Sequence, residues 1–184
     1  MTQPTVVTDR DAFRAVAGDV APGTRVPVEV QVTVTDPFVA YRRAREGDGQ
    51  GGVFLETTGG QSGWGYFGVD PIDRLSVGPD DDPALQPLVE RPDAANLARG
   101  DCTVPYPCGA VGWLSYDVAR ELETLPTDAV RDRDLPRLQL AAYDCLAAWE
   151  EPRGESTTLH VTACPRVDPD GNEGAPVDAR SEEH

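Results

Sequence analysis

The sequence predicts an α+β fold, with a mostly antiparallel β-sheet and a few peripheral helices. Valines alternate with other residues over 26–34, which is the two-residue period of a strand with one apolar face. Short runs rich in β-branched and aromatic residues then recur between Gly and Pro turns from residue 53 to residue 164. Helical patterns are few and short, so helices are expected at the periphery of the sheet.

The N-terminal segment predicts one helix and one strand. Thr8 and Asp11 resemble a capping pair, and the apolar spacing that follows favours a helix over 9–20. The valine-striped strand at 26–34 is expected to pack one side on a core and to turn the other to water or a partner. Because Pro27 has no N–H to donate to a ladder, this strand should begin at a sheet edge.

The middle of the chain alternates between turns and short elements. Asp36-Pro37 is typical of a helix start, and this second helix should stop before Gly47. The segment 78–100 is polar and rich in Pro, and is interpreted as an exposed excursion with one helix at 84–90. Asp117 is expected to cap another helix at 118–123. Further strands are expected at 53–57, 64–69, 72–77, 109–116, 138–149 and 156–164.

The charge is unusual and excludes several classes of protein. The 184 residues carry 32 acidic and 16 basic side chains, a formal charge of −16, and every basic one is Arg. Such self-repulsion is screened in molar salt, where the Debye length is about 3 Å, so the composition suggests a protein of a high-salt cytoplasm. Nucleic acid is excluded as a partner because a polyanion would be repelled. Neither a membrane span nor a secretory signal is expected.

Composition also divides the chain and defines the role of its cysteines. Residues 1–164 are predicted to form one domain, and the acidic, Pro- and Gly-rich residues 165–184 a disordered tail. The four cysteines are expected to be reduced, with Cys145 a small buried apolar residue, and their spacing does not favour a metal site.

No catalytic set is predicted anywhere in the sequence, but Glu56 is a candidate binding residue. It follows the apolar run 53–55 and precedes a glycine turn. One interpretation is that Glu56 simply alternates outward to water. The other is that it faces a pocket at a strand end, where its carboxylate could bind a ligand ammonium group. Trp64, Trp113 and Trp149 are expected in the core rather than at a ligand site.

An ordered series of motifs resembles the chorismate-using enzymes anthranilate synthase component I and aminodeoxychorismate synthase component I. Phe-Leu-Glu-Thr at 54–57 is similar to the family's Leu-Leu-Glu-Ser. Tyr-Phe-Gly-Val-Asp-Pro at 66–71 is similar to Phe-Ile-Gly-x-Asp-Pro, and residues 107–117 resemble Gly-Gly-x-x-Gly-Tyr-x-x-Tyr-Asp. The helix start at 35–41 and the dipeptides at 135–136 and 143–144 continue the series in order.

The resemblance covers residues 25–165 and implies only the N-terminal domain of the family. That domain forms half of a two-sheet sandwich that a C-terminal chorismate-binding domain completes. The resemblance also implies a tryptophan-like pocket at Leu55, Glu56 and Thr57, in which Thr keeps the hydroxyl of Ser. No cofactor is expected in this chain, and the implied Mg²⁺ belongs to the catalytic domain. A glutamine amidotransferase, component II, is the implied partner that supplies ammonia.

The branch of the family is interpreted from one departure and one spacing. Gly63-Trp64-Gly65 stands where anthranilate synthases have Arg-Tyr-Ser, and Glu56 and Asp70 are closely spaced. Both features favour the N-terminal domain of an aminodeoxychorismate synthase component I, on the route to 4-aminobenzoate and folate. The alternatives are the N-terminal part of anthranilate synthase component I, a stand-alone module that binds an aromatic amino acid, or a non-functional remnant. On every alternative the chain alone is expected to be inactive and cytoplasmic.

Overall fold

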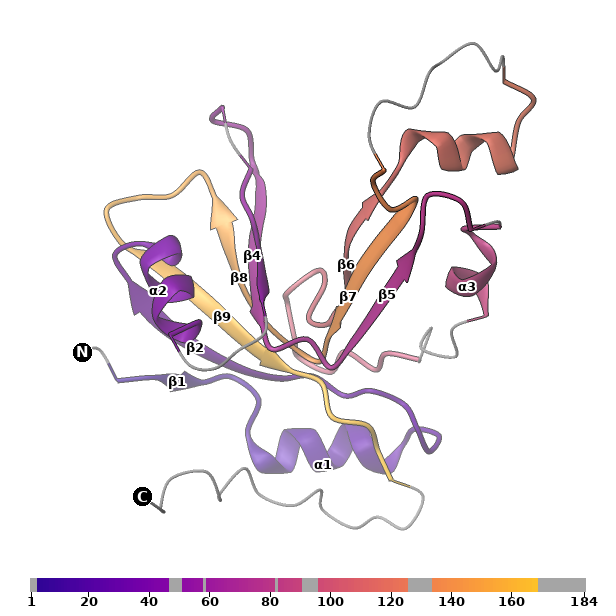
Figure 1. Cartoon of the computed structure of the whole chain (residues 1–184). Coiled ribbons are helices and arrows are strands. Elements are labelled where there is room, and N and C mark those ends of the chain that lie inside the picture. The colour runs from indigo at the N-terminus through magenta and orange to yellow at the C-terminus, as the bar shows by residue number, and fades with distance from the viewer. Residues whose placement is uncertain are drawn as a thin grey trace, which may run out of the picture.

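The strands pair antiparallel, as the sequence predicts, but they form two sheets where one is expected (Figure 1). The computed structural model describes residues 3–46, 51–57, 59–81, 83–90, 96–125 and 134–168. Within them, one sheet has the order β1-β2-β9-β8-β4-β3 and the other the order β5-β7-β6. The strands are β1 (Thr5–Val6), β2 (Val28–Val34), β3 (Gly52–Leu55), β4 (Gly63–Val69), β5 (Asp73–Val77), β6 (Gly109–Leu114), β7 (Leu138–Tyr143), β8 (Cys145–Glu151) and β9 (Thr157–Ala163).

The strand β2 lies inside the larger sheet and not at its edge, which corrects the expectation from Pro27. It pairs with β9 along its whole length, and β1 adds a short pairing on the other side, at Val30 and Gln31. Pro27 precedes the first strand residue, so its missing N–H interrupts no ladder. The position of Pro27 therefore fixes where β2 begins rather than which place it takes in the sheet.

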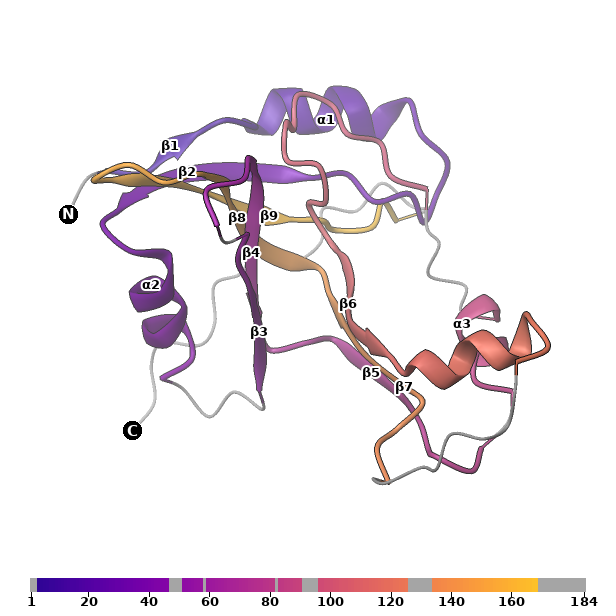
Figure 2. The same ribbon diagram turned by 90° about the horizontal axis from the view of Figure 1, so that it is seen from above.

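One face of the larger sheet packs on a core, and the polar face is covered only in part, since Thr33, Glu150 and Thr158 on it are exposed. On one face Tyr41 of α2, Phe67, Trp149 and Leu159 form a buried apolar cluster. The other face is crossed by the segment 102–107. Figure 2 shows α1 and α2 on opposite sides of β2. As a result Glu29 of β2 is 0 % exposed, whereas the valines of this strand are only half-buried.

The apolar run at 138–149 forms two strands, where the sequence predicts one. The chain bends at Asp144, so that β7 belongs to the smaller sheet and β8 to the larger one. The bend is held by the backbone, because the Cys164 N–H donates to the Asp144 carbonyl at 2.8 Å. Cys145, which follows the bend, is exposed, so the expectation that it is buried is wrong.

The helices of the described ranges are short, and side chains cap all of them except the one at Gln86–Val89. The helix α1 (Arg10–Gly18) is capped by Asp9, whose carboxylate accepts from the backbone of Asp11 and Ala12. Asp36 caps α2 (Pro37–Ala44) as expected. The helix α3 (Gln86–Val89) is shorter than its predicted range, and the 3-10 helix η1 (Tyr116–Glu121) is capped by Ser115 instead of Asp117.

The chain that follows β9 stays attached to the sheet for a few residues. Val26 donates to the carbonyl of Pro165, and Val167 exchanges backbone hydrogen bonds with Gly23 and Thr24. The rest of the tail that the sequence predicts to be disordered, residues 169–184, lies outside the described residues. In the described ranges no helix is long and apolar enough to cross a membrane.

Candidate functional site

The candidate residues Leu55, Glu56 and Thr57 lie where β3 ends and the turn to β4 begins. Leu55 is the last residue of β3 and is exposed. Thr57 is half-buried, and its Oγ1 donates a hydrogen bond of 3.4 Å to the Trp64 carbonyl on β4. This bond joins the two ends of the turn between β3 and β4. Glu56 lies between Leu55 and Thr57, at the start of that turn.

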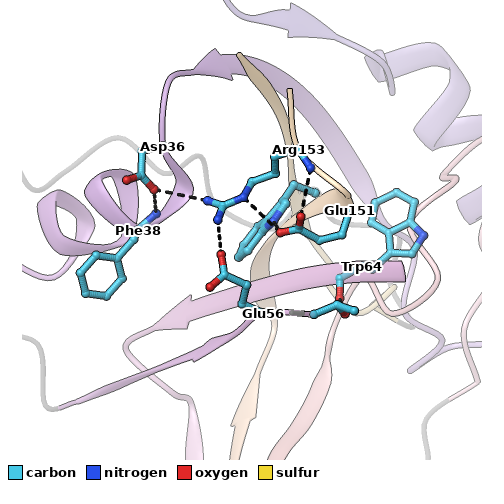
Figure 3. A network of polar contacts seen from close by, with 8 residues as sticks. Asp36, Phe38, Glu56, Trp64, Glu151 and Arg153 are labelled. Carbon is cyan, nitrogen blue, oxygen red and sulfur yellow. Dashed lines mark hydrogen bonds and ion pairs between the residues drawn. The ribbon is translucent and has the colours of Figure 1, made fainter. Parts of the chain in front are cut away.

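Arg153 lies at the centre of a group of three carboxylates that includes Glu56 (Figure 3). Its guanidinium pairs with Glu56 through Nη2, with Glu151 through Nε at 3.2 Å, and with Asp36 through Nη1 at 3.5 Å. Asp36 also accepts the Phe38 N–H at 2.8 Å as the cap of α2. The guanidinium therefore joins the end of β3, the start of α2 and the chain that leaves β8.

Glu151 connects this group to the core of the sheet. Its Oε1 accepts a hydrogen bond of 2.6 Å from the indole Nε1 of Trp149, a side chain with no exposed surface. Its Oε2 accepts the Arg153 N–H at 3.1 Å. The Glu151 side chain is 7 % exposed, and this burial strengthens its charge-assisted bonds.

Trp149 can lie flat against the sheet because β4 has a glycine opposite it. Gly65 pairs with Trp149 in the ladder between β4 and β8. A Cβ atom built on Gly65 would lie 2.2 Å from Cε2 and Cζ2 of the indole ring. Gly65 of the Gly63-Trp64-Gly65 segment therefore makes room for the ring that donates to Glu151.

The group as a whole carries more negative than positive charge. Three carboxylates surround one guanidinium, and the side chains of Glu56 and Arg153 remain 30 % and 32 % exposed. Glu56 thus lies at the exposed surface, as one of the two interpretations expects, but its carboxylate is paired with Arg153. A ligand ammonium group could reach Glu56 only by sharing or replacing the contact with Arg153.

The arrangement offers charged and hydrogen-bonding groups to a ligand. In the described ranges, no group of three or more His, Cys, Asp and Glu side chains could hold a metal ion. Arg153 also lines a polar hollow of about 360 Å³ together with Gln31, Thr157 and His160. This hollow adjoins the ion-pair group through Arg153.

Sequence reasoning found Glu56 but missed its partners. Arg153 is 97 positions away, and no spacing rule connects the two residues. Of the expected core tryptophans, Trp149 is fully buried and Trp64 half-buried, whereas Trp113 is 36 % exposed at the sheet surface. The one local signal for the site was Glu151-Pro152-Arg153, a charged group directly after an apolar strand.

No protein-family model matches the chain, but curated proteins do. This chain is 66 % identical over 163 residues to anthranilate synthase component 1 1 of Haloarcula marismortui, and the match covers 89 % of this chain and 33 % of that protein. A second protein of that organism, component 1 3, is 57 % identical over 175 residues, covering 91 % of this chain and 34 % of the relative. Anthranilate synthase component 1 of Mycobacterium tuberculosis is 30 % identical over 175 residues, covering 83 % of this chain and 33 % of its own length. The chain thus spans about one third of the length of the relatives it matches.

Proposed function

We propose that this chain, which belongs to the anthranilate synthase component I family as its N-terminal part, serves as the N-terminal domain of an anthranilate synthase. The observation that carries the proposal is the 66 % identity over 163 residues to a component 1 protein of Haloarcula marismortui. The names of the relatives favour the tryptophan branch over the aminodeoxychorismate branch that Gly63-Trp64-Gly65 suggested. That departure has a local reason in this chain, since Gly65 accommodates Trp149.

In this proposal the chemistry is carried by the two thirds of the relatives' length that the chain does not span. The chorismate and Mg²⁺ site would lie there, and ammonia would come from a glutamine amidotransferase. The smaller sheet supports such a division, because β6 is its edge strand and exposes Trp113 and Leu114, next to the exposed Tyr116. Exposed apolar side chains at a sheet edge are typical of an interface with another domain.

The test is reconstitution of activity. The chain would be mixed in molar KCl with the remaining two thirds of the 66 % identical relative, chorismate, Mg²⁺ and ammonium, and anthranilate would be followed by its fluorescence. We expect product from the mixture and none from either part alone. Turnover by the isolated chain would overturn the assignment of the chemistry to the other part. Formation of aminodeoxychorismate in place of anthranilate would return the chain to the 4-aminobenzoate branch.

A second candidate function is the binding of an aromatic amino acid at Leu55, Glu56 and Thr57. It is favoured by the excess of carboxylates around Arg153, which would attract an ammonium group. Calorimetry with tryptophan in molar KCl tests it, with micromolar binding expected for the parent chain and lost in Glu56→Ala. Glu155→Ala is the matched control, because Glu155 is an exposed carboxylate on the β8–β9 connection. The absence of heat with the parent chain would reject this function.

A further inference from the structure

Two cysteines that are distant in the sequence, Cys108 and Cys164, lie together where the two sheets meet. Cys108 directly precedes β6 of the smaller sheet, and Cys164 directly follows β9 of the larger one. Gly109, next to Cys108, pairs with Tyr143, and Ala163, next to Cys164, pairs with Cys145, so both cysteines lie beside Asp144. We propose that this pair is a redox-sensitive dithiol, which a peroxide oxidises to a disulfide that joins the two sheets.

The backbone on both sides of the pair is held in place by hydrogen bonds. Thr162 donates through Oγ1 to the Pro107 carbonyl at 2.6 Å, which anchors the residue before Cys108 to the strand that leads to Cys164. The Cys164 N–H donates to Asp144, and the Cys164 carbonyl accepts a bond of 2.9 Å from Nη1 of Arg25. These bonds hold the backbone beside each cysteine in place, so the fold keeps the two cysteines next to Asp144.

The two thiols differ in exposure and in acidity. Cys108 is half-buried, whereas Cys164 is 1 % exposed. A hydrogen bond from Cys164, followed by the charges of Arg25 and Arg99, lowers the pKa of Cys108 to about 7 against the opposing effects of burial and Asp144. The bond to Cys108, then burial, raises the pKa of Cys164. Cys108 is thus the thiolate that an oxidant can reach, and Cys164 is the resolving thiol.

The oxidation balances with one peroxide for each pair of thiols. The Cys108 thiolate attacks a peroxide oxygen, the O–O bond breaks, and the departing hydroxide takes up a proton to leave as water while Cys108 becomes a sulfenic acid. The Cys164 sulfur, losing its proton, then attacks the Cys108 sulfur. The S–O bond breaks, the S–S bond forms and a second water leaves. The two thiols supply the two electrons that reduce the peroxide.

The disulfide would restrict the relative motion of the sheets. It would add a covalent connection beside the bend at Asp144, where β7 of one sheet continues into β8 of the other. Closing a long loop lowers the entropy of the unfolded chain, so the oxidised protein should unfold at a temperature several degrees higher than the reduced one.

The test is peptide mapping of the chain after treatment with hydrogen peroxide in molar KCl, with free thiols blocked before digestion. Trypsin cuts after Arg99, Arg120, Arg153 and Arg166, so Cys102 and Cys108 share one peptide and Cys164 lies in another. We expect these two peptides to be joined, with fragmentation placing the bond at Cys108. The cross-link should form faster as the pH rises through about 7.

Three cysteine variants make the result specific. The cross-link should be lost in Cys108→Ser and retained in Cys102→Ser and in Cys145→Ser, which removes an exposed thiol of β8. The unfolding temperature should rise on oxidation only in the proteins that form the bond. A cross-link through Cys102, oxidation that stops at separate sulfenic or sulfinic acids, or unreacted Cys108 would each overturn the proposal. Because the map of the parent chain needs no variant, poor folding of Cys108→Ser would not obscure the outcome.

Discussion

His160 of β9 lies with its Nδ1 atom 2.8 Å from Oε1 of Glu29, a carboxylate on β2 that has no exposed surface. Gln31 donates to the same oxygen at 3.1 Å, whereas Oε2 of Glu29 has no hydrogen-bond partner among the described residues. Trp64 stands edge-on to the His160 ring, with ring centroids 5.4 Å apart. An ionisable side chain is therefore buried inside the larger sheet, where the side chains of His160 and Gln31 stabilise it.

Removing either Glu29 or His160 should destabilise the fold. We expect Glu29→Ala or His160→Ala to lower the free energy of unfolding by about 3 kcal/mol, because each leaves a buried polar group without its partner. Glu29→Gln should cost less, since an amide can still bond to His160 and Gln31. Urea unfolding in molar KCl measures the three values. Equal losses for Glu29→Gln and Glu29→Ala would show that packing, and not the polar contact, determines the effect.

Glu29 should also make the stability of the fold sensitive to acid. Burial of Glu29 opposes its ionisation, but the bonds from His160 and Gln31 and the charge of His160 outweigh it and lower its pKa below the usual value of 4.5. A carboxyl with a lower pKa in the folded state contributes full stability above its unfolded pKa and loses it as the pH falls through the folded pKa. The difference in stability between the parent chain and Glu29→Gln should therefore shrink below about pH 4.5. A difference that grows in acid would contradict this sign.

Gly65 should tolerate no side chain. We expect Gly65→Ala to destabilise the fold by about 2 kcal/mol, because its Cβ would overlap the buried indole of Trp149. Gly18→Ala is the matched control, since nothing lies within 4 Å of a Cβ there and Gly18 ends α1. That change should be neutral or stabilising by about 0.5 kcal/mol. Thermal unfolding of both variants in the same salt gives the comparison, and equal stability would show that the ring can move aside.

Local patterns predicted the elements well but did not predict how distant segments meet. The alternation of valines located β2, and the Asp36-Pro37 pair located the start of α2. The break at Asp144 was missed because no Gly or Pro interrupts the apolar run, and the sheets on either side are defined by partners elsewhere in the chain. The sequence predicts that the face of β2 that carries Glu29 meets water or a partner, because the segment that covers Glu29, near Thr103, lies far along the chain. For the same reason, the sequence identified Glu56 but not the arginine that holds it.

Arg153 should contribute little to stability in high salt and more in low salt. Its partners Asp36, Glu56 and Glu151 repel one another when the guanidinium is removed, and Debye screening weakens that repulsion in molar KCl. We expect Arg153→Ala to cost about 1 kcal/mol in molar salt and more at about 0.1 M. The unfolding free energy of the parent chain and the variant would be measured across this range of KCl.

Arg153→Lys separates the charge of the arginine from its shape. A lysine restores the positive charge but cannot point three N–H groups at three carboxylates in one plane. Arg153→Lys should therefore show the salt dependence of the parent chain but recover only part of the stability that Arg153→Ala loses in molar KCl. Full recovery by lysine would show that charge alone holds the group together. If Arg153→Ala lost the same stability at every salt concentration, the loss would come from the packing of the arginine stem, and the electrostatic account of the site would be wrong.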